Sequence, residues 1–192
     1  NVNNKNTNVI LGEKNYTVFG KGNITDILCG VEIEISPHSF YQVNHDGAQQ
    51  LYSIAKDSLK LTENDILLDM YCGAGSIGLS MADKIKQLVG VEIVPQAVEN
   101  AKINAKKMGF DNARFICADA KDASKMLLEE NFLPTAVVVD PPRKGCDEDT
   151  LNAIISMNVP KISMISCNHA TAARDCKYLA EHGYTVEFVQ PF

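Results

Sequence analysis

The residues best suited to chemistry stand directly after short apolar segments. Asp140 follows the run Ala-Val-Val-Val, and Cys167 follows a run that includes Ile165. A carboxylate can hold a polar ligand, and a thiol becomes a nucleophile when its surroundings lower its pKa, as a helix beginning near Ala170 could do. Ligands bind beyond the carboxyl ends of strands in open α/β sheets, so we expect both side chains at one site. A lone cysteine can equally be an inert structural residue.

A glycine-rich segment links two further predicted elements. Gly73, Gly75 and Gly78 fit the pattern G-x-G-x-x-G at a point where a strand would turn into a helix. Glycines let the backbone approach a ligand closely, and a helix start offers free N–H groups. Glu92 ends the next predicted strand, where a carboxylate can accept both ribose hydroxyls of an adenosine. The spacing does not separate NAD from S-adenosylmethionine, and a tight turn without a ligand is the alternative.

Three more residues flank these candidates. Asp119 follows another predicted strand, and it either contacts an adenine or caps the next helix through its side chain. Pro141 and Pro142 come directly after Asp140 and stiffen the backbone there. We therefore expect a rigid loop beside the cofactor, where a flat substrate can be held. The alternative is that the two prolines only end the strand.

The elements that must position these residues alternate between strands and helices. This alternation predicts an α/β fold with a doubly wound, mostly parallel sheet over residues 36–192. Residues 1–35, rich in Asn and Gly, predict a small β-rich segment left from a preceding domain, with strands such as 16–19 and 31–35. The other predicted strands are 65–71, 88–92, 114–117, 136–140, 161–166 and 184–189, and the predicted helices are 48–59, 95–108, 121–130, 148–156 and 170–182.

Composition limits the class of protein. The chain has 192 residues and 45% hydrophobic residues, enough for a sizeable core. Its net charge of -6 argues against a protein that binds nucleic acid by charge alone. No apolar run approaches the length of a membrane span, so we expect no membrane partner. The six cysteines contain no C-x-x-C pair, which predicts no metal site and favours reduced thiols in a cytoplasm.

Four blocks in order resemble the RNA uracil-carbon-5 methyltransferases, the family that makes 5-methyluridine. The resemblance runs from about Ile35 to Phe192 and implies a Rossmann-like fold with S-adenosyl-L-methionine as cofactor. The first and last blocks are specific, because ordinary methyltransferases and dehydrogenases lack them. The blocks are SFYQVN at residues 39–44, the turn at residues 69–78, DPPRKG at residues 140–145, and SCN at residues 166–168 with Ala170, Thr171, Arg174 and Asp175.

The resemblance implies roles for individual residues. Cys167 matches the family's nucleophile, which adds to carbon 6 of uracil so that carbon 5 can take a methyl group. The expected substrate-side residues are Pro141, Pro142, Arg143 and Asn168. The expected cofactor-binding residues, from the resemblance and the glycine pattern together, are Gln42, Tyr71, Gly73, Gly75, Ser76, Glu92, Asp119 and Asp140.

Two departures from the family pattern matter. His169 stands where the family usually has proline, which can alter the loop after Cys167. The family continues beyond Phe192 into a segment that carries the proton-removing glutamate, and then into a last strand. We therefore expect a C-terminally truncated fragment that binds cofactor but lacks the general base. Unpaired backbone groups in its incomplete sheet would allow self-association.

RNA is the expected partner, with its own binding domain missing from this chain. The DPPRKG form resembles the 23S ribosomal RNA branch of the family more than the tRNA branch. A tRNA uridine methyltransferase is one alternative. An NAD-dependent oxidoreductase would explain the glycines and Glu92 but not Cys167, and a non-catalytic binding module would suit the acidic charge.

Overall fold

A computed structural model describes residues 15–37 and 40–191. The Asn-rich start and Ser39 lie outside the described residues, as does Phe192. The predicted domain boundary at residue 35 stays a prediction.

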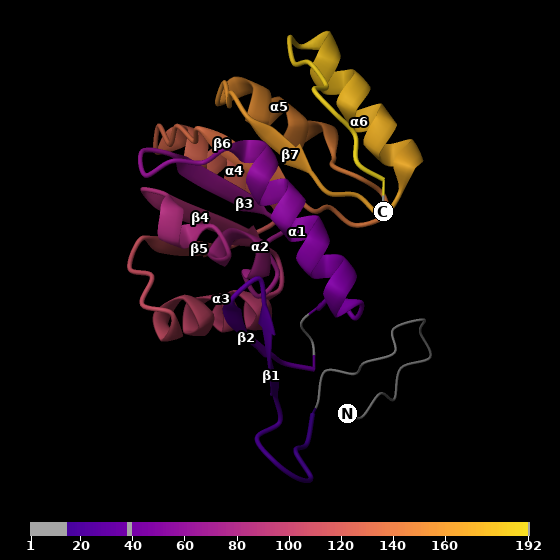
Figure 1. Cartoon of the computed structure of the whole chain (residues 1–192). Coiled ribbons are helices and arrows are strands. Elements are labelled where there is room, and N and C mark those ends of the chain that lie inside the picture. Colours follow the sequence, from indigo (N-terminus) through magenta and orange to yellow (C-terminus); the bar gives the residue numbers. More distant parts are fainter. Residues whose placement is uncertain (1–14, 38–39, 192) are drawn as a thin grey trace.

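A five-stranded parallel sheet organises the chain (Figure 1). Its spatial order is β5-β4-β3-β6-β7. The first strand of the sheet, β3, is therefore central, and the later strands are added outward on both sides of it. This is the doubly wound α/β architecture that the alternating pattern predicted. The strands are β3 (Ile66–Met70), β4 (Gln87–Glu92), β5 (Ala113–Cys117), β6 (Ala136–Val139) and β7 (Ile162–Met164).

Helices follow the strands and cover both faces of the sheet (Figure 1). The five predicted helices are all present, with ends that differ from the prediction by a few residues. The helix start predicted after the glycine-rich turn is present as a single turn, whereas the short 3₁₀ turn was not predicted, because one helical turn has no periodicity to detect. The helices are α1 (His45–Leu59), α2 (Ser76–Leu79), α3 (Pro95–Lys107), α4 (Ala120–Glu129), α5 (Glu148–Ser156) and α6 (His169–Glu181), with a 3₁₀ turn η1 (Ala82–Lys84).

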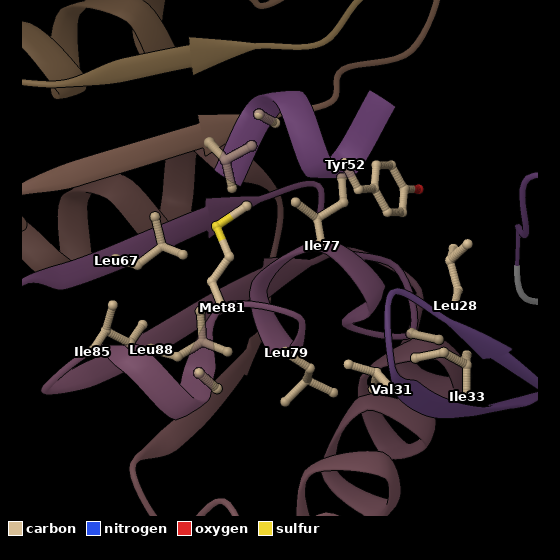
Figure 2. Close-up of a cluster of buried hydrophobic side chains, with 14 of the residues drawn as sticks. Leu28, Val31, Ile33, Tyr52, Leu67, Ile77, Leu79, Met81, Ile85 and Leu88 are labelled. Carbon is tan, nitrogen blue, oxygen red and sulfur yellow. The ribbon is translucent and has the colours of Figure 1, made fainter. Parts of the chain in front are cut away.

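Alternate residues of the strands enter two separate cores. Leu67 and Val138 belong to the core under α1 and α2, which Figure 2 shows with Tyr52 beside Ile77. Leu68 belongs to the opposite core, which packs under α4, α5 and α6. Both faces of each central strand are therefore buried, and this explains their continuous apolar sequence.

A small antiparallel hairpin, β1 (Ile24–Leu28) and β2 (Val31–Ile35), joins the first core. Asn104 of α3 is fully buried and connects the hairpin to the glycine-rich turn. Its Oδ1 accepts the Glu34 N–H at 2.8 Å, and its Nδ2 donates to the Ala74 carbonyl at 3.0 Å. The Asn104 amide thus holds the turn between β3 and α2 against α3 and the hairpin.

The strand predicted over residues 16–19 is wrong. Residues 15–23 form no strand, and the hairpin's first strand begins at Ile24 instead. Val18 and Phe19 are 96% and 97% exposed, so their side chains make no packing contacts that would stabilise a strand. β-branched and aromatic residues favour a strand only where they pack.

The strand predicted over residues 184–189 is also wrong. This segment runs back alongside α6 without strand pairing, and Val186, Phe188 and Val189 are at least half exposed (Figure 1). A strand forms only where a neighbouring backbone offers a ladder of hydrogen bonds. β7 pairs with β6 alone among the described strands, and 184–189 does not reach it. Self-association through this edge stays a prediction.

Asp65 anchors the amino-terminal ends of three neighbouring strands. It is 7% exposed, and it accepts hydrogen bonds from Thr62, Thr135 and Lys161. Burial raises the pKa of Asp65, but these hydrogen bonds outweigh burial and lower it to about 2. The charged carboxylate therefore stabilises the junction between β3, β6 and β7.

No helix among residues 15–37 and 40–191 has the length and apolarity to cross a bilayer.

Replacing this carboxylate should make stability less dependent on acid pH. We expect Asp65→Asn to lower the free energy of unfolding by about 2 kcal/mol at neutral pH. Because the folded-state pKa is depressed, the difference from wild type should shrink as pH falls from about 4 towards about 2. Urea unfolding at several pH values measures it. Asp57→Asn on the exposed face of α1 is the control, and an equal pH-independent loss would contradict the prediction.

Candidate active site

The turn after β3 adopts backbone conformations that open space for a ligand. Tyr71, Gly73 and Gly75 all have positive φ, at 65°, 55° and 85°. A Cβ on Gly73 would meet no atom within 4 Å, whereas one on Gly75 would lie 3.0 Å from Leu79. Gly73 therefore borders open space, and Gly75 is required by close packing. The Tyr71 ring packs towards α5, and burial raises its pKa well above the usual range.

The glycine-rich turn leads into a helix start, as predicted, and one N–H of that helix is already bonded within the protein. α2 is a single turn, and its Gly78 N–H donates to Oδ2 of Asp69 at 2.8 Å. That donor is therefore already used within the protein. Asp69 itself is fully buried, and its Oδ1 has no hydrogen-bond partner among the described residues.

Glu92 holds the glycine-rich turn against the end of β4. Its Oε2 accepts the Gly73 N–H at 3.0 Å, and its Oε1 accepts the Val94 N–H at 2.8 Å. The carboxylate is half-buried at the carboxyl edge of the sheet. It is thus oriented by the backbone, which leaves its remaining lone pairs for hydroxyl donors of a ligand.

Tyr52 gathers three of the predicted cofactor residues around one hydroxyl. It lies on α1 and is 3% exposed. Burial, together with the charges of Asp140 and Asp69, raises the pKa of Tyr52 to about 12, whereas hydrogen bonding to Ser76 and Gln42 acts to lower it. Sequence reasoning placed Tyr52 only on a packing face of the helix. Nothing in its helical spacing distinguishes a core aromatic from one whose hydroxyl reaches a site.

Carboxyl groups crowd this edge. Burial is the main cause that raises the pKa of Asp69 to about 8, with the charges of Asp140 and Glu92 adding to it. Burial also raises the pKa of Asp140 to about 6. A cation beside these groups would favour their ionised forms and lower their pKa values.

Asp119 takes the capping role that its position allowed. Its Oδ1 accepts the Asp122 N–H at 2.8 Å at the start of α4, and its side chain is exposed. Its predicted contact with an adenine stays a prediction.

Cys167 lies in the turn between β7 and α6 and is exposed. The next residue, Asn168, caps α6 by accepting the Ala170 N–H at 3.0 Å. Its Nδ2 donates to the Arg143 carbonyl at 3.1 Å. The cysteine turn is therefore attached directly to the loop that follows Asp140, as two neighbouring strand ends require.

The loop over residues 140–146 is compact. Pro141 is buried, Pro142 and Arg143 are exposed, and the Gly145 N–H donates to the Pro142 carbonyl at 2.8 Å. The Asp140 N–H is within 3.4 Å of the Met70 carbonyl, which links this loop to the glycine-rich turn. The two prolines thus belong to a rigid turn, and Asn168 holds its backbone.

No group of three potential metal ligands occurs among the residues that the structure describes.

The fold and this edge together define a class of protein. The chain has the Rossmann-like fold of S-adenosylmethionine-dependent methyltransferases with a small antiparallel sheet added. Residues 31–189 match the model of the tRNA (uracil-5-)-methyltransferase family, and the chain belongs to that family. The predicted cofactor, S-adenosylmethionine, agrees with this membership.

Relatives support the assignment. The chain is 44% identical over 191 residues to an uncharacterized RNA methyltransferase of Clostridium acetobutylicum, covering all of this chain and 42% of that protein. A Bacillus cereus uncharacterized RNA methyltransferase is 45% identical with the same coverage. The chain thus spans under half the length of these relatives.

A solved relative resembles the structure over most of the chain. It is the Pyrococcus abyssi tRNA (uracil-54, C5)-methyltransferase in complex with S-adenosyl-L-homocysteine, 30% identical, with a TM-score of 0.67. The similarity covers 83% of this chain and 38% of that one. The precorrin-6y C5,15-methyltransferase of Geobacter metallireducens, 19% identical with a TM-score of 0.66 over 78% of each chain, shares the fold alone.

The buried Asp69 should make stability fall as pH rises. Its pKa is raised in the folded state. The unfolded chain therefore ionises this carboxyl from about pH 4, whereas the folded protein keeps it protonated up to about pH 8, and the free energy of unfolding falls over that interval. We expect Asp69→Asn, which keeps an oxygen acceptor for Gly78, to gain stability relative to wild type across that range. Urea unfolding at pH 5 and pH 8 measures it, with Asp122→Asn as the control. A difference that does not change with pH would refute this.

Proposed function

We propose that this chain is the catalytic part of an enzyme that transfers a methyl group from S-adenosylmethionine to carbon 5 of a uridine in RNA. The single observation that carries the proposal is the attachment of the Cys167 turn to the Asp140 loop. Asn168 makes that attachment through the Arg143 carbonyl. A nucleophile and the end of a cofactor cradle thus share one edge of the sheet, which methyl transfer to a carbon activated by a thiolate requires.

The residues present fit the proposed cofactor. The open space at Gly73 lets a ligand approach the backbone, and the bound carboxylate of Glu92 can accept ribose hydroxyls. The unpartnered Oδ1 of Asp69 and the half-buried Asp140 favour a cation nearby. S-adenosylmethionine carries an ammonium and a sulfonium, and its sulfonium methyl is the electrophile that it supplies when bound.

Cys167 would supply the nucleophile. Its thiolate adds to carbon 6 of the uracil, and the electron pair of the carbon 5–carbon 6 double bond moves towards the carbonyl at carbon 4. Carbon 5 thereby becomes electron-rich enough to accept a methyl group. Removal of the carbon 5 proton by a base then returns the electron pair and expels the thiolate. The rigid loop at residues 140–146 would hold the flat base, which must leave its stack to reach this edge.

Uridine in 23S ribosomal RNA is the proposed target within RNA. The DPPRKG form of the loop supports it, whereas the solved archaeal relative is named for position 54 of tRNA. Competition between a ribosomal RNA fragment and a tRNA for the same protein, followed by mapping of 5-methyluridine, decides between them. Methylation of tRNA alone would overturn the ribosomal target and leave the chemistry in place.

Cofactor binding should depend on Glu92. We expect S-adenosylhomocysteine to bind in calorimetric titration and NAD not to bind. Loss of two charge-assisted hydrogen bonds should make Glu92→Ala bind about tenfold to a hundredfold more weakly. Glu99→Ala on the exposed face of α3 is the control. Binding of NAD in place of S-adenosylhomocysteine would favour the oxidoreductase alternative.

Covalent capture should depend on Cys167. An RNA that carries 5-fluorouridine forms the same adduct, but fluorine cannot leave as a proton does, so the complex persists. With S-adenosylmethionine present, we expect a denaturation-resistant protein–RNA band for wild type and for Cys117→Ser, an exposed cysteine at the end of β5. Cys167→Ser should give no band. An equal band from Cys167→Ser would refute the proposed nucleophile.

A further inference from the structure

We infer that Arg174 and Asp175 of α6 are positioning residues for the reaction, because they fix the spacing between the Asp140 loop and the Cys167 turn. This inference rests on the proposed function and adds residues to it. Neither side chain lies among the predicted substrate or cofactor contacts. Both belong to the helix that begins directly after the nucleophile's turn.

Asp175 is a carboxylate buried beneath the loop. It is 1% exposed, and its Oδ2 accepts the Cys146 N–H at 2.8 Å. Its Oδ1 accepts from Nε of Arg174 at 2.8 Å. A buried charge is tolerated only when it is paired and hydrogen-bonded, and here both oxygens are used. The carboxylate therefore has one satisfied arrangement, in which the end of the loop lies against α6.

Arg174 extends the same attachment to the loop's carbonyl groups. Its Nη2 donates to the Lys144 carbonyl at 2.9 Å and to the Cys146 carbonyl at 3.0 Å. The planar guanidinium presents its donors in a fixed geometry, which lysine cannot reproduce. Arg174 and Asp175 together thus bind three backbone groups of a loop that has no regular secondary structure.

Gly145 shows how close this contact is. Its φ is 77°, and a Cβ there would lie 2.6 Å from both Arg174 Nη2 and Asp175 Oδ2. Only glycine fits, because any side chain would displace the pair and strain the backbone. The glycine that ends the DPPRKG block and the two charged residues of α6 therefore depend on one another.

The same helix carries the other end of the attachment. Thr171 Oγ1 donates to the Asn168 carbonyl at 3.0 Å and lies 3.4 Å from the Arg143 carbonyl, which also accepts from Asn168. Backbone carbonyls of the loop are thus bound to α6 at its first turn and again at its second. Asp140 at one end of the loop and Cys167 beside the helix therefore keep a fixed separation. Such a separation matters because misplacement by about 1 Å can cost about a hundredfold in rate.

The test separates positioning from stability and from cofactor binding. Asp175→Asn has the same shape but offers one oxygen, so it must lose either the Cys146 N–H or the guanidinium. Arg174→Lys keeps the positive charge and loses the planar set of N–H donors that bonds Asp175 and the loop carbonyls. The control is Glu181→Gln, an exposed acid on the same helix. The protein at its natural length is used, well below the melting temperature of each variant, and the rate of adduct formation with 5-fluorouridine RNA is measured at saturating RNA and cofactor.

We expect Asp175→Asn and Arg174→Lys to form the adduct about a hundredfold more slowly than wild type. Their affinity for S-adenosylhomocysteine should stay within about twofold, because most of the predicted cofactor residues lie between the end of β3 and the start of α2 or at the end of β4. A purely structural role would lower the melting temperature without changing the rate per folded molecule, and that result would overturn the inference. Equal losses of rate and cofactor affinity would also overturn it.

Failure of the proposed function has a different signature. If wild type forms no adduct with 5-fluorouridine RNA of either ribosomal or tRNA sequence, the uridine chemistry is wrong and the inference falls with it. If wild type forms the adduct and both variants match its rate, the inference alone is wrong. Should Asp175→Asn fail to fold, Arg174→Lys alone decides, because it leaves the buried carboxylate paired with a cation.

Discussion

The constraint on which this structure depends is the common direction of its strands. Each strand of a parallel sheet delivers its carboxyl end to the same edge, so the turns after β3, β4, β6 and β7 meet there. Glu92, Asp140 and Cys167 are far apart in sequence, yet Glu92 ends β4, and Asp140 and Cys167 follow β6 and β7. The two cores, one on each face of the sheet, keep the edge in place, because both faces of the central strands are buried.

At this edge, side chains organise irregular backbone. Glu92 holds the glycine-rich turn, Asn104 joins that turn to the hairpin, and Asp175 holds the loop after Asp140. In each case a buried or half-buried polar group accepts or donates hydrogen bonds that a loop cannot make by itself. The predicted binding and catalytic residues therefore stand on turns whose backbone is held by these hydrogen bonds.

The sequence predicted most of the regular elements and failed where packing decides. α1 and α3 were predictable because their apolar residues repeat at helical spacing. Residues 16–19 and 184–189 have strand-like composition but find no pairing backbone, and the single 3₁₀ turn η1 has no periodicity to detect. Tyr52, which lies beside three predicted cofactor residues, was not itself predicted for a related reason. An aromatic at a core position has the same spacing whether or not its hydroxyl reaches a ligand.

By itself, the sequence determined the alternating α/β pattern, the glycine-rich turn and the residues that end each strand, because these are local properties of neighbouring residues. It also carried the blocks that identify the family. Only the tertiary structure decided that Asp69 is buried with an unpartnered oxygen, and that Arg174 and Asp175 hold the DPPRKG loop. Hydrogen bonds between residues about thirty positions apart depend on how the helices pack, which no local pattern specifies.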